Sequence, residues 1–253
     1  MEHDNSMFDG KVAVVTGGGR GIGRAIALAF ARCGADVAVA SRTLDELEGV
    51  ADEVRATGQR SLGVQTDITV KADVDNLASK VKDELGSIDI LVNNAATNVM
   101  RNLLELREDK WDQIIDTDLK GYWLCSQAMG KVMVEQGGGC IINISSTAAQ
   151  KAAKGMGVYC IAKAGVGMLT RALALELGPS NIRVNAVAPS VVRTGFSKPI
   201  WSDPEMLAKV APDIPLGRIA EPEDVAEMAL FLASDASSYL TGQTVCLDGG
   251  ISA

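Results

Sequence analysis

The chain has 253 residues, of which 47% are hydrophobic and 4% aromatic, and 24 basic against 32 acidic residues give a net charge of −8 with histidine neutral. A chain of this length buries roughly 70–75% of its unfolded surface and needs neither disulfide nor metal to hold a core. The acidic balance repels phosphate backbones, so nucleic acid is not an expected partner. The single histidine, His3, precedes the predicted elements, which argues against Ser-His-Asp hydrolysis and against a metal site.

The cysteines indicate reduced thiols of an intracellular protein, because they form no Cys-x-x-Cys pair and lie among apolar residues. They are Cys33, Cys125, Cys140, Cys160 and Cys246. The N-terminal segment lacks the apolar core of a signal peptide, and Lys or Arg interrupts each long apolar run before about 18 residues. We expect a cytoplasmic protein that does not associate with membranes.

Short β-rich runs alternate with longer helical stretches along the chain. The predicted strands are Val12–Val15, Asp36–Ala40, Ser61–Gln65, Ile88–Asn93, Cys140–Ile144, Ile182–Ala188 and Val245–Asp248. Helical spacing covers Arg24–Cys33, Leu44–Thr57, Lys71–Leu85, Arg107–Gln136 and Val158–Leu177. Continuous apolar strands that alternate with helices are typical of a doubly wound parallel α/β sheet with helices on both faces. We expect one domain over residues 1–253, with an irregular substrate loop at about 190–216.

A glycine-rich turn, Thr16-Gly-Gly-Gly-Arg-Gly-Ile-Gly23, joins the first strand to a helical stretch. Glycine lets the backbone approach a pyrophosphate at a helix N-terminus, whose dipole favours negative charge. The spacing is Thr-Gly-x-x-x-Gly-x-Gly, and no Gly-Lys-[Ser/Thr] follows, so a P-loop is excluded. A turn that only joins strand to helix is the alternative. The predicted cofactor contacts here are Gly17, Gly19, Arg20, Gly21, Ile22 and Gly23.

The end of the second predicted strand favours NADP(H) over NAD(H). An acidic residue there would bind the ribose 2′-hydroxyl of NAD, but the sequence has Ser41 and Arg42. A guanidinium pairs well with a 2′-phosphate, and Arg20 offers a second cation. The alternative is that Arg42 is a solvated residue at the start of a helix.

Tyr159 and Lys163 lie four residues apart in a helical stretch and therefore share one face. A nearby ammonium and a cationic nicotinamide together could lower the pKa of the phenol from about 10 to about 7. Ser145 and Ser146 follow a predicted strand, where open α/β sheets bind ligands and a hydroxyl can hold a carbonyl oxygen. Alone, this spacing also fits a packing tyrosine and a solvent-facing lysine.

Six motifs in register carry a resemblance across nearly the whole chain. They are Thr16–Gly23, Asp67-Ile68, Asn93-Asn-Ala-Ala96, Ile144-Ser-Ser146, Tyr159-Cys-Ile-Ala-Lys163 and Asn185-Ala-Val-Ala-Pro189 through Thr194. The sequence resembles the short-chain dehydrogenase/reductase family, in its group of about 250-residue members, here of an NADP-preferring type. The resemblance implies a single-domain Rossmann-type fold and an NAD(P)-dependent oxidoreductase.

The resemblance also implies a role for each matched residue. Ser146 would be the catalytic serine and Tyr159 the acid/base, while Lys163 would lower the tyrosine pKa and hold the nicotinamide ribose. Further cofactor contacts would be Asp67 and Ile68 at the adenine, Asn94 at the ribose, and Val192 and Thr194 at the carboxamide and phosphates. Family members of this length are usually homotetramers built through the two long helices and the last strand.

Three residues depart from the family pattern. Asp118 stands where the family has its fourth catalytic residue, an asparagine. The backbone carbonyl that the family uses is present in Asp118 as well. The charge of the Asp118 side chain, however, would oppose the lowering of the Tyr159 pKa and shift the pH optimum of activity to alkaline values. Ala96 and Ser190 replace glycines, so both turns are expected to avoid positive φ.

These observations predict an NADP(H)-dependent carbonyl reductase, which interconverts a ketone and a secondary alcohol with Ser146, Tyr159, Lys163 and Asp118 at the reacting centre. The predicted apolar wall of the substrate site comprises Met100, Met156, Val158, Phe196, Ile200, Trp201 and Met206. The alternatives are a 3-oxoacyl-thioester reductase, which shares every motif, and a catalytically weak partner subunit that binds NAD(P), which Asp118 motivates. A nucleotide-sugar epimerase would need a longer chain.

Overall fold

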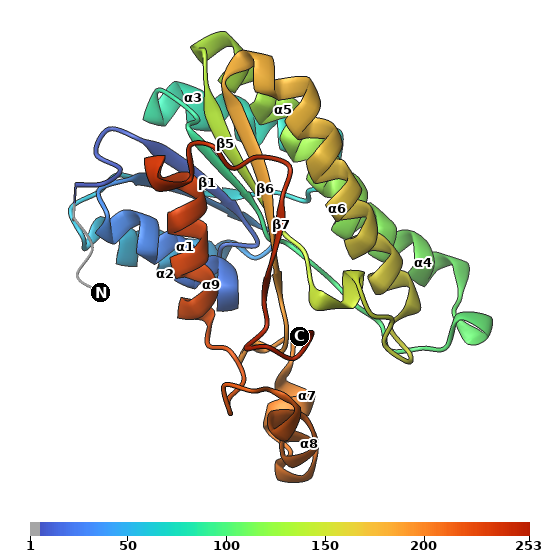
Figure 1. Cartoon of the computed structure of the whole chain (residues 1–253). Helices are drawn as coiled ribbons and strands as arrows, with labels where there is room; N and C mark the ends of the chain where they lie inside the picture. Colours follow the sequence, from blue (N-terminus) through green and yellow to red (C-terminus); the bar gives the residue numbers. More distant parts are fainter. Residues whose placement is uncertain (1–5) are drawn as a thin grey trace.

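The strands form one parallel sheet. The computed structural model describes residues 6–253, so the expectations about the N-terminal segment and His3 lie outside the described residues. Within that range, seven strands pair in the order β3-β2-β1-β4-β5-β6-β7 (Figure 1). They are β1 Val12–Thr16, β2 Asp36–Ser41, β3 Ser61–Gln65, β4 Ile90–Asn93, β5 Gly139–Ile144, β6 Ile182–Pro189 and β7 Thr244–Leu247. The predicted doubly wound sheet is confirmed, and each predicted strand end lies within two residues of the observed one.

The helices connect these strands. They are α1 Gly21–Arg32, α2 Leu44–Arg55, α3 Lys71–Leu85, α4 Glu108–Ile115, α5 Gly121–Gln136, α6 Gly157–Leu177, α7 Lys198–Trp201, α8 Pro204–Val210 and α9 Pro222–Ala233. Short 3-10 turns are η1 Leu103–Glu105, η3 Thr147–Ala149, η4 Gly178–Ser180, η5 Ala211–Asp213 and η6 Asp235–Ser237. Helix α9 was not predicted from the sequence, although Pro222 stands at its first position and the reciprocal capping bonds of Glu221 and Asp224 mark its start.

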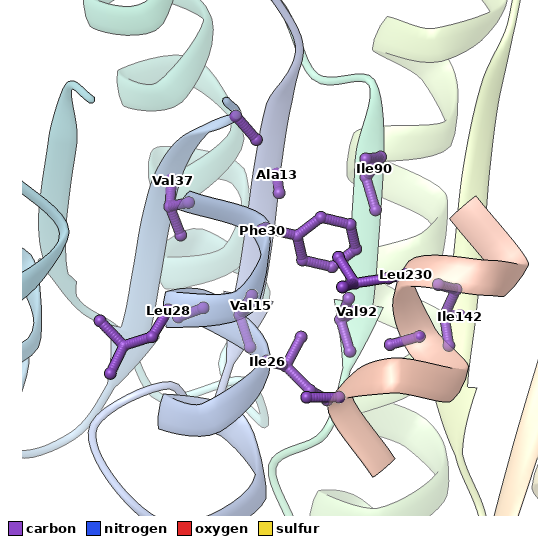
Figure 2. Packing of buried hydrophobic residues seen from close by; sticks show 14 of the residues in the cluster. Ala13, Val15, Ile26, Leu28, Phe30, Val37, Ile90, Val92, Ile142 and Leu230 are labelled. Carbon is purple, nitrogen blue, oxygen red and sulfur yellow. The ribbon is translucent and has the colours of Figure 1, made fainter. Parts of the chain in front are cut away.

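Two layers of helices enclose the sheet. Helices α1, α2 and α9 cover one face, and α3, α5 and α6 cover the other (Figure 1). Because successive strand residues face opposite sides, Ala13 and Val15 of β1 join the first core and Val14 joins the second. Figure 2 shows Phe30 of α1 and Leu230 of α9 packed in the first core. Both faces of β1 are therefore buried, as its continuous apolar sequence requires.

The predicted helix over Arg107–Gln136 is confirmed for residues 108–136, but one turn within it is not α-helical. A π-helical turn, η2 (Asp116–Lys120), separates α4 from α5. A π turn is wider than an α turn and changes the direction of the side chains within it, often at a functional site. In this turn the side chain of Asp118 is fully buried, whereas that of Asp116 is 41% exposed.

The predicted substrate loop at about 190–216 is partly helical, because it contains α7, α8 and η5. Figure 1 shows α7 and α8 projecting from the end of the sheet near the C-terminus of the chain. Among the described residues, the stretch Gly157–Ser180 is long and apolar enough to cross a membrane, but 56% of its apolar window is buried inside the fold. Burial of that kind is typical of a core helix.

Candidate active site

The predicted site residues gather at the carboxyl ends of the central strands. The strand order reverses between β1 and β4, since the chain continues from β1 to β2 on one side and returns from β3 to β4 on the other. In open α/β sheets, ligands bind at such a reversal. The glycine turn follows β1, Asn94 follows β4, Ser146 follows β5 and Val192 follows β6.

The glycine turn is closed so tightly that side chains are excluded at its two ends. A Cβ on Gly23 would lie 2.2 Å from the carbonyl oxygen of Gly17, and a Cβ on Gly17 would lie 2.8 Å from Cα of Ala95. Gly17 and Gly21 have φ of +64° and +54°, in the left-handed region that glycine favours. The turn thus exposes backbone at the N-terminus of α1, the arrangement that binds a pyrophosphate. These features fit a dinucleotide.

Two further predicted contacts border this turn. The Nδ2 of Asn94 donates hydrogen bonds to the carbonyl oxygens of Thr16, at 3.0 Å, and Gly17, at 3.2 Å. Thr194 lies on the other side, because a Cβ on Gly21 would be 3.4 Å from its methyl group. Asn94 therefore fixes the turn to the end of β4, and Thr194 brings the substrate loop against it.

The residues predicted to contact the adenosine end of the cofactor lie beyond β2 and β3. A surface depression of about 340 Å³ is lined by Arg42, Gln65, Asp67, Asp73 and Asn76. The backbone oxygen of Arg42 accepts a hydrogen bond from Gln65 Nε2 at 2.9 Å, and Asp67 accepts from the backbone and hydroxyl of Thr69. The structure thus brings Arg42 and Asp67 together. Ile68 is buried against the position of Gly121 in α5 instead, and Ser41 Oγ bonds the backbone of Thr43.

The two arginines proposed for the 2′-phosphate differ in their surroundings. Nη1 of Arg20 lies 3.5 Å from a carboxylate oxygen of Glu46, on α2. The guanidinium of Arg42 is exposed and has no ion-pair partner within residues 6–253. Arg42 is therefore the cation that is free for a ligand.

Ser146, Tyr159 and Lys163 meet between β5 and α6. Ser146 Oγ accepts a hydrogen bond from the backbone of Ala148 at 3.1 Å, as the cap of η3. The neighbouring Ser145 donates to the backbone oxygen of Lys163 at 3.1 Å and so ties β5 to α6. Tyr159 and Lys163 are 7% and 1% exposed, and Lys163 Nζ lies 5.6 Å from the centre of the Tyr159 ring.

The protein alone does not provide the expected lowering of the Tyr159 pKa. Burial raises the pKa of Tyr159 above its usual value, the charge of Asp118 raises it further, and the hydrogen bond with Ser146 lowers it. Burial also lowers the pKa of Lys163, against the attraction of Asp118. A tyrosine base in this chain therefore needs additional positive charge, such as that of an oxidised nicotinamide, or the loss of the Asp118 charge.

Tyr122 is part of this centre but was missed in the sequence analysis. It is fully buried on α5, its hydroxyl accepts a hydrogen bond from Lys163 Nζ at 3.1 Å, and it donates to the carbonyl oxygen of Ile144 at 3.1 Å. No local pattern of the sequence marked it, because its contact with Lys163 depends on the packing of α5 against α6.

The substrate loop brings one predicted wall residue against the reacting centre. The ring centre of Phe196, 51% exposed, lies 5.9 Å from that of Tyr159. Trp201 Nε1 donates to the carbonyl oxygen of Thr194 at 2.8 Å and fixes α7 to the loop. Val158 is buried beside Ile114 and belongs to the core. Met100, Met206 and Phe196 are exposed.

The other expectations concern thiols, turns and metals. Among the described residues the five cysteines form no disulfide, and burial raises the pKa of Cys125 to about 12 and that of Cys140 to about 11. Among the described residues, Asn181 alone combines a side chain with positive φ, so the expectation for Ala96 and Ser190 is confirmed. Within residues 6–253, no group of three or more His, Cys, Asp or Glu side chains could hold a metal ion.

Comparison with known proteins identifies the chain at the level of its family. A family model described as enoyl-(acyl carrier protein) reductase matches residues 17–252. The chain is 41% identical to an uncharacterised oxidoreductase of Mycobacterium tuberculosis, over 98% of this chain and 94% of that protein. It is 39% identical to D-erythrulose reductase of Gallus gallus, over 99% of this chain and 98% of that protein.

Two solved structures show the same fold with cofactor. One, from Beutenbergia cavernae, is described as an NAD(P)-dependent gluconate 5-dehydrogenase with bound NADP; its TM-score is 0.92 at 37% identity, covering 98% of both chains. The other is 7α-hydroxysteroid dehydrogenase with NADH and a 7-oxo bile acid, with a TM-score of 0.93 at 35% identity over 98% of this chain and 96% of that one.

The fold and these relatives define an NAD(P)-dependent oxidoreductase with a Rossmann-type sheet, which acts on small molecules. The chain belongs to the short-chain dehydrogenase/reductase family.

Proposed function

We propose that the protein interconverts a ketone and a secondary alcohol with NADP(H), with Ser146, Tyr159 and Lys163 at the reacting centre. One observation carries this proposal: the buried Tyr159 of α6 lies beside Ser146 and Lys163 at the end of β5, and only β4 separates β5 from β1, the strand that the glycine turn follows. A carbonyl carbon at that point would face both a proton donor and the nicotinamide.

The bound reduced cofactor would supply the hydride. In the reductive direction, the Ser146 hydroxyl would donate a hydrogen bond to the carbonyl oxygen, and the Tyr159 hydroxyl would transfer its proton to that oxygen as the C–H bond forms. Lys163 would stabilise the resulting tyrosinate by its positive charge. In the oxidative direction, the tyrosinate would accept the proton of the alcohol.

The preference for NADP(H) over NAD(H) is supported by the free guanidinium of Arg42 in the depression beyond β2. A 2′-phosphate placed there would gain a charge-assisted hydrogen bond, whereas a bare 2′-hydroxyl would meet no carboxylate on Ser41 or Arg42. The glycine turn and Asn94 would hold the rest of the dinucleotide in either case.

Replacing the acid/base is the direct test of this function. We expect Tyr159→Phe to lower ketone reduction by about 10²–10⁴-fold and to leave NADPH affinity within about twofold of wild type, because the phenyl ring keeps the packing against Phe196. Tyr239→Phe removes the same hydroxyl from a fully exposed position and serves as the control. Full activity of Tyr159→Phe would refute the assignment.

The substrate we propose has an apolar group beside its carbonyl, because the partly exposed Phe196 ring lies 5.9 Å from that of Tyr159. Turnover of a free aromatic ketone is therefore expected to exceed turnover of an acetoacetyl thioester, measured by NADPH absorbance. The reverse order would favour a 3-oxoacyl-thioester reductase.

We also propose that residues 1–253 act as one domain, that the protein works in the cytoplasm without a membrane or nucleic-acid partner, and that it is a homotetramer. Described cysteines that form no disulfide support a reducing compartment. The exposed apolar side chains of α5 and α6 support association of copies through these helices. They are Trp123, Val134, Ile161, Met168 and Leu175.

A further inference from the structure

A carboxylate and an ammonium are buried together beneath the proposed acid/base. The Oδ2 of Asp118 lies 3.5 Å from Nζ of Lys163, and their side chains are 0% and 1% exposed. The other oxygen, Oδ1, accepts a hydrogen bond from the backbone of Thr97 at 2.8 Å. No hydrogen-bond donor among the described residues reaches Oδ2, so the charge of Lys163 is what compensates it.

The ammonium of Lys163 makes two hydrogen bonds and one ion pair. It donates to the carbonyl oxygen of Ile144 at 3.0 Å and to the hydroxyl of Tyr122 at 3.1 Å, and it pairs with Asp118 by charge alone. Tyr122 also donates to Ile144, so its hydroxyl is fixed at both ends. Both hydrogen bonds of the Lys163 ammonium therefore go to groups other than Tyr159, although the ammonium lies 5.6 Å from the centre of the Tyr159 ring.

The titratable groups around Asp118 are Lys163 and Tyr159 on α6 and Tyr122 on α5. Burial raises the pKa of Asp118 to about 6, and the Lys163 ammonium together with the Thr97 hydrogen bond opposes that rise. The Asp118 charge in turn raises the pKa of both tyrosines. An ionised Asp118 thus cancels much of the positive charge that Lys163 would otherwise direct at Tyr159.

We propose that Asp118 is a positioning residue that controls Tyr159 through Lys163: its carboxylate holds and neutralises the ammonium, and its protonation leaves Lys163 as an uncompensated positive charge beside the phenol. The consequence for catalysis rests on the proposed function of Tyr159. An asparagine at this position would give the Thr97 hydrogen bond but no charge. The chain therefore carries a second titrating group in its reacting centre.

The chain offers a direct measurement because it has three tyrosines, Tyr122, Tyr159 and Tyr239. Protein labelled with ¹³C at tyrosine Cζ gives one resonance for each, assigned with single Tyr→Phe variants. Without cofactor or substrate, we expect the Tyr159 and Tyr122 resonances to shift with a common midpoint near pH 6, as Asp118 titrates. The fully exposed Tyr239 is the internal reference.

Three variants assign that midpoint to Asp118. Asp118→Asn should remove the shift, and Asp116→Asn should keep it, because Asp116 lies in the same turn but pairs with Lys120 at the surface. Lys163→Met should move the midpoint to higher pH, because the ammonium that favours the carboxylate is gone. No shift near pH 6 in wild type, or a shift that persists in Asp118→Asn, would overturn the proposal.

The second readout is the pH profile of alcohol oxidation. Replacing the charge of Asp118 should lower the pKa of Tyr159, so the alkaline inflection of kcat/KM should move down by about one pH unit or more in Asp118→Asn and remain in place in Asp116→Asn. A residue with a purely structural role would lower the rate at every pH without moving the inflection, and that result would refute the proposal. Absence of turnover in wild type would refute the proposed function instead, while the resonance titration still decides the role of Asp118.

Discussion

Arg42 and Arg20 carry the same charge, yet their surroundings give them different roles. Arg20 shares its guanidinium with Glu46, in an exposed pair with 3.5 Å between the charged atoms, and such pairs contribute at most about 1 kcal/mol. Arg42 has no such competitor within residues 6–253. A 2′-phosphate would meet a free cation at Arg42, whereas at Arg20 it would have to displace a carboxylate.

We therefore expect Arg42→Asp to weaken NADPH binding by about tenfold to a hundredfold, the equivalent of one lost charge-assisted hydrogen bond, and to improve NADH binding by offering an acceptor to the 2′-hydroxyl. Parallel titrations of nucleotide fluorescence measure both. Glu46→Gln is the matched variant, and it should tighten NADPH binding by freeing Arg20. Equal affinities of the wild type for the two nucleotides would contradict the preference.

At the residue scale, motif spacing predicted which side chains meet, because parallel strands end at one edge of the sheet and residues four apart share a helix face. Ser146, Tyr159 and Lys163 were predicted to meet for that reason, whereas Asp118 was predicted from the resemblance to the family; the structure brings the four together. The partners of Lys163 could not be predicted. Its bond to Tyr122 depends on the packing of α5 against α6, which no local pattern of the sequence encodes.

At the scale of elements, the π turn between α4 and α5 is a feature that the apolar periodicity of the sequence did not predict. The apolar spacing over Arg107–Gln136 fits one amphipathic helix, and a single wider turn shifts that pattern by only one residue. Within the π turn, Asp118 lies inside and Asp116 lies at the surface. Gly121 permits it, since a Cβ there would lie 2.6 Å from Ile68.

The turn between β1 and α1 gives an element-scale prediction. We expect Gly23→Ala to lower the free energy of unfolding by about 1–3 kcal/mol and to abolish nucleotide binding, because its Cβ would overlap the Gly17 carbonyl oxygen and Asn94. Gly49→Ala is the matched control. Gly49 lies in α2 with no atom near its Cβ position, so alanine should raise stability by up to about 1 kcal/mol. Thermal melts measure the stability of the two variants, and nucleotide titrations measure their binding. Normal nucleotide binding by Gly23→Ala would contradict the role of the glycine turn in holding the dinucleotide.

Both faces of the sheet are buried, but one of the two helical layers has exposed apolar residues on its solvent side. Helices α1, α2 and α9 cover the first core (Figure 1), and Figure 2 shows side chains of α1 packed beside Leu230 of α9. On the other side, α6 buries Val166 and Thr170 yet exposes Ile161, Met168 and Leu175. These three residues recur every seven positions and so form one stripe along the helix. A stripe of this kind on a core helix is typical of an interface between copies.

We expect the wild type to sediment as a tetramer and Met168→Glu to sediment as a smaller species. Met168, 61% exposed, lies in the middle of the α6 stripe, so a carboxylate there would be desolvated in the interface and would face its own symmetry mate. Leu44→Glu places the same charge on an apolar residue of α2, 41% exposed, in the opposite helical layer, and should leave the assembly unchanged. If the wild type is monomeric, or if both variants sediment like the wild type, the α6 stripe is not an interface between copies of the chain.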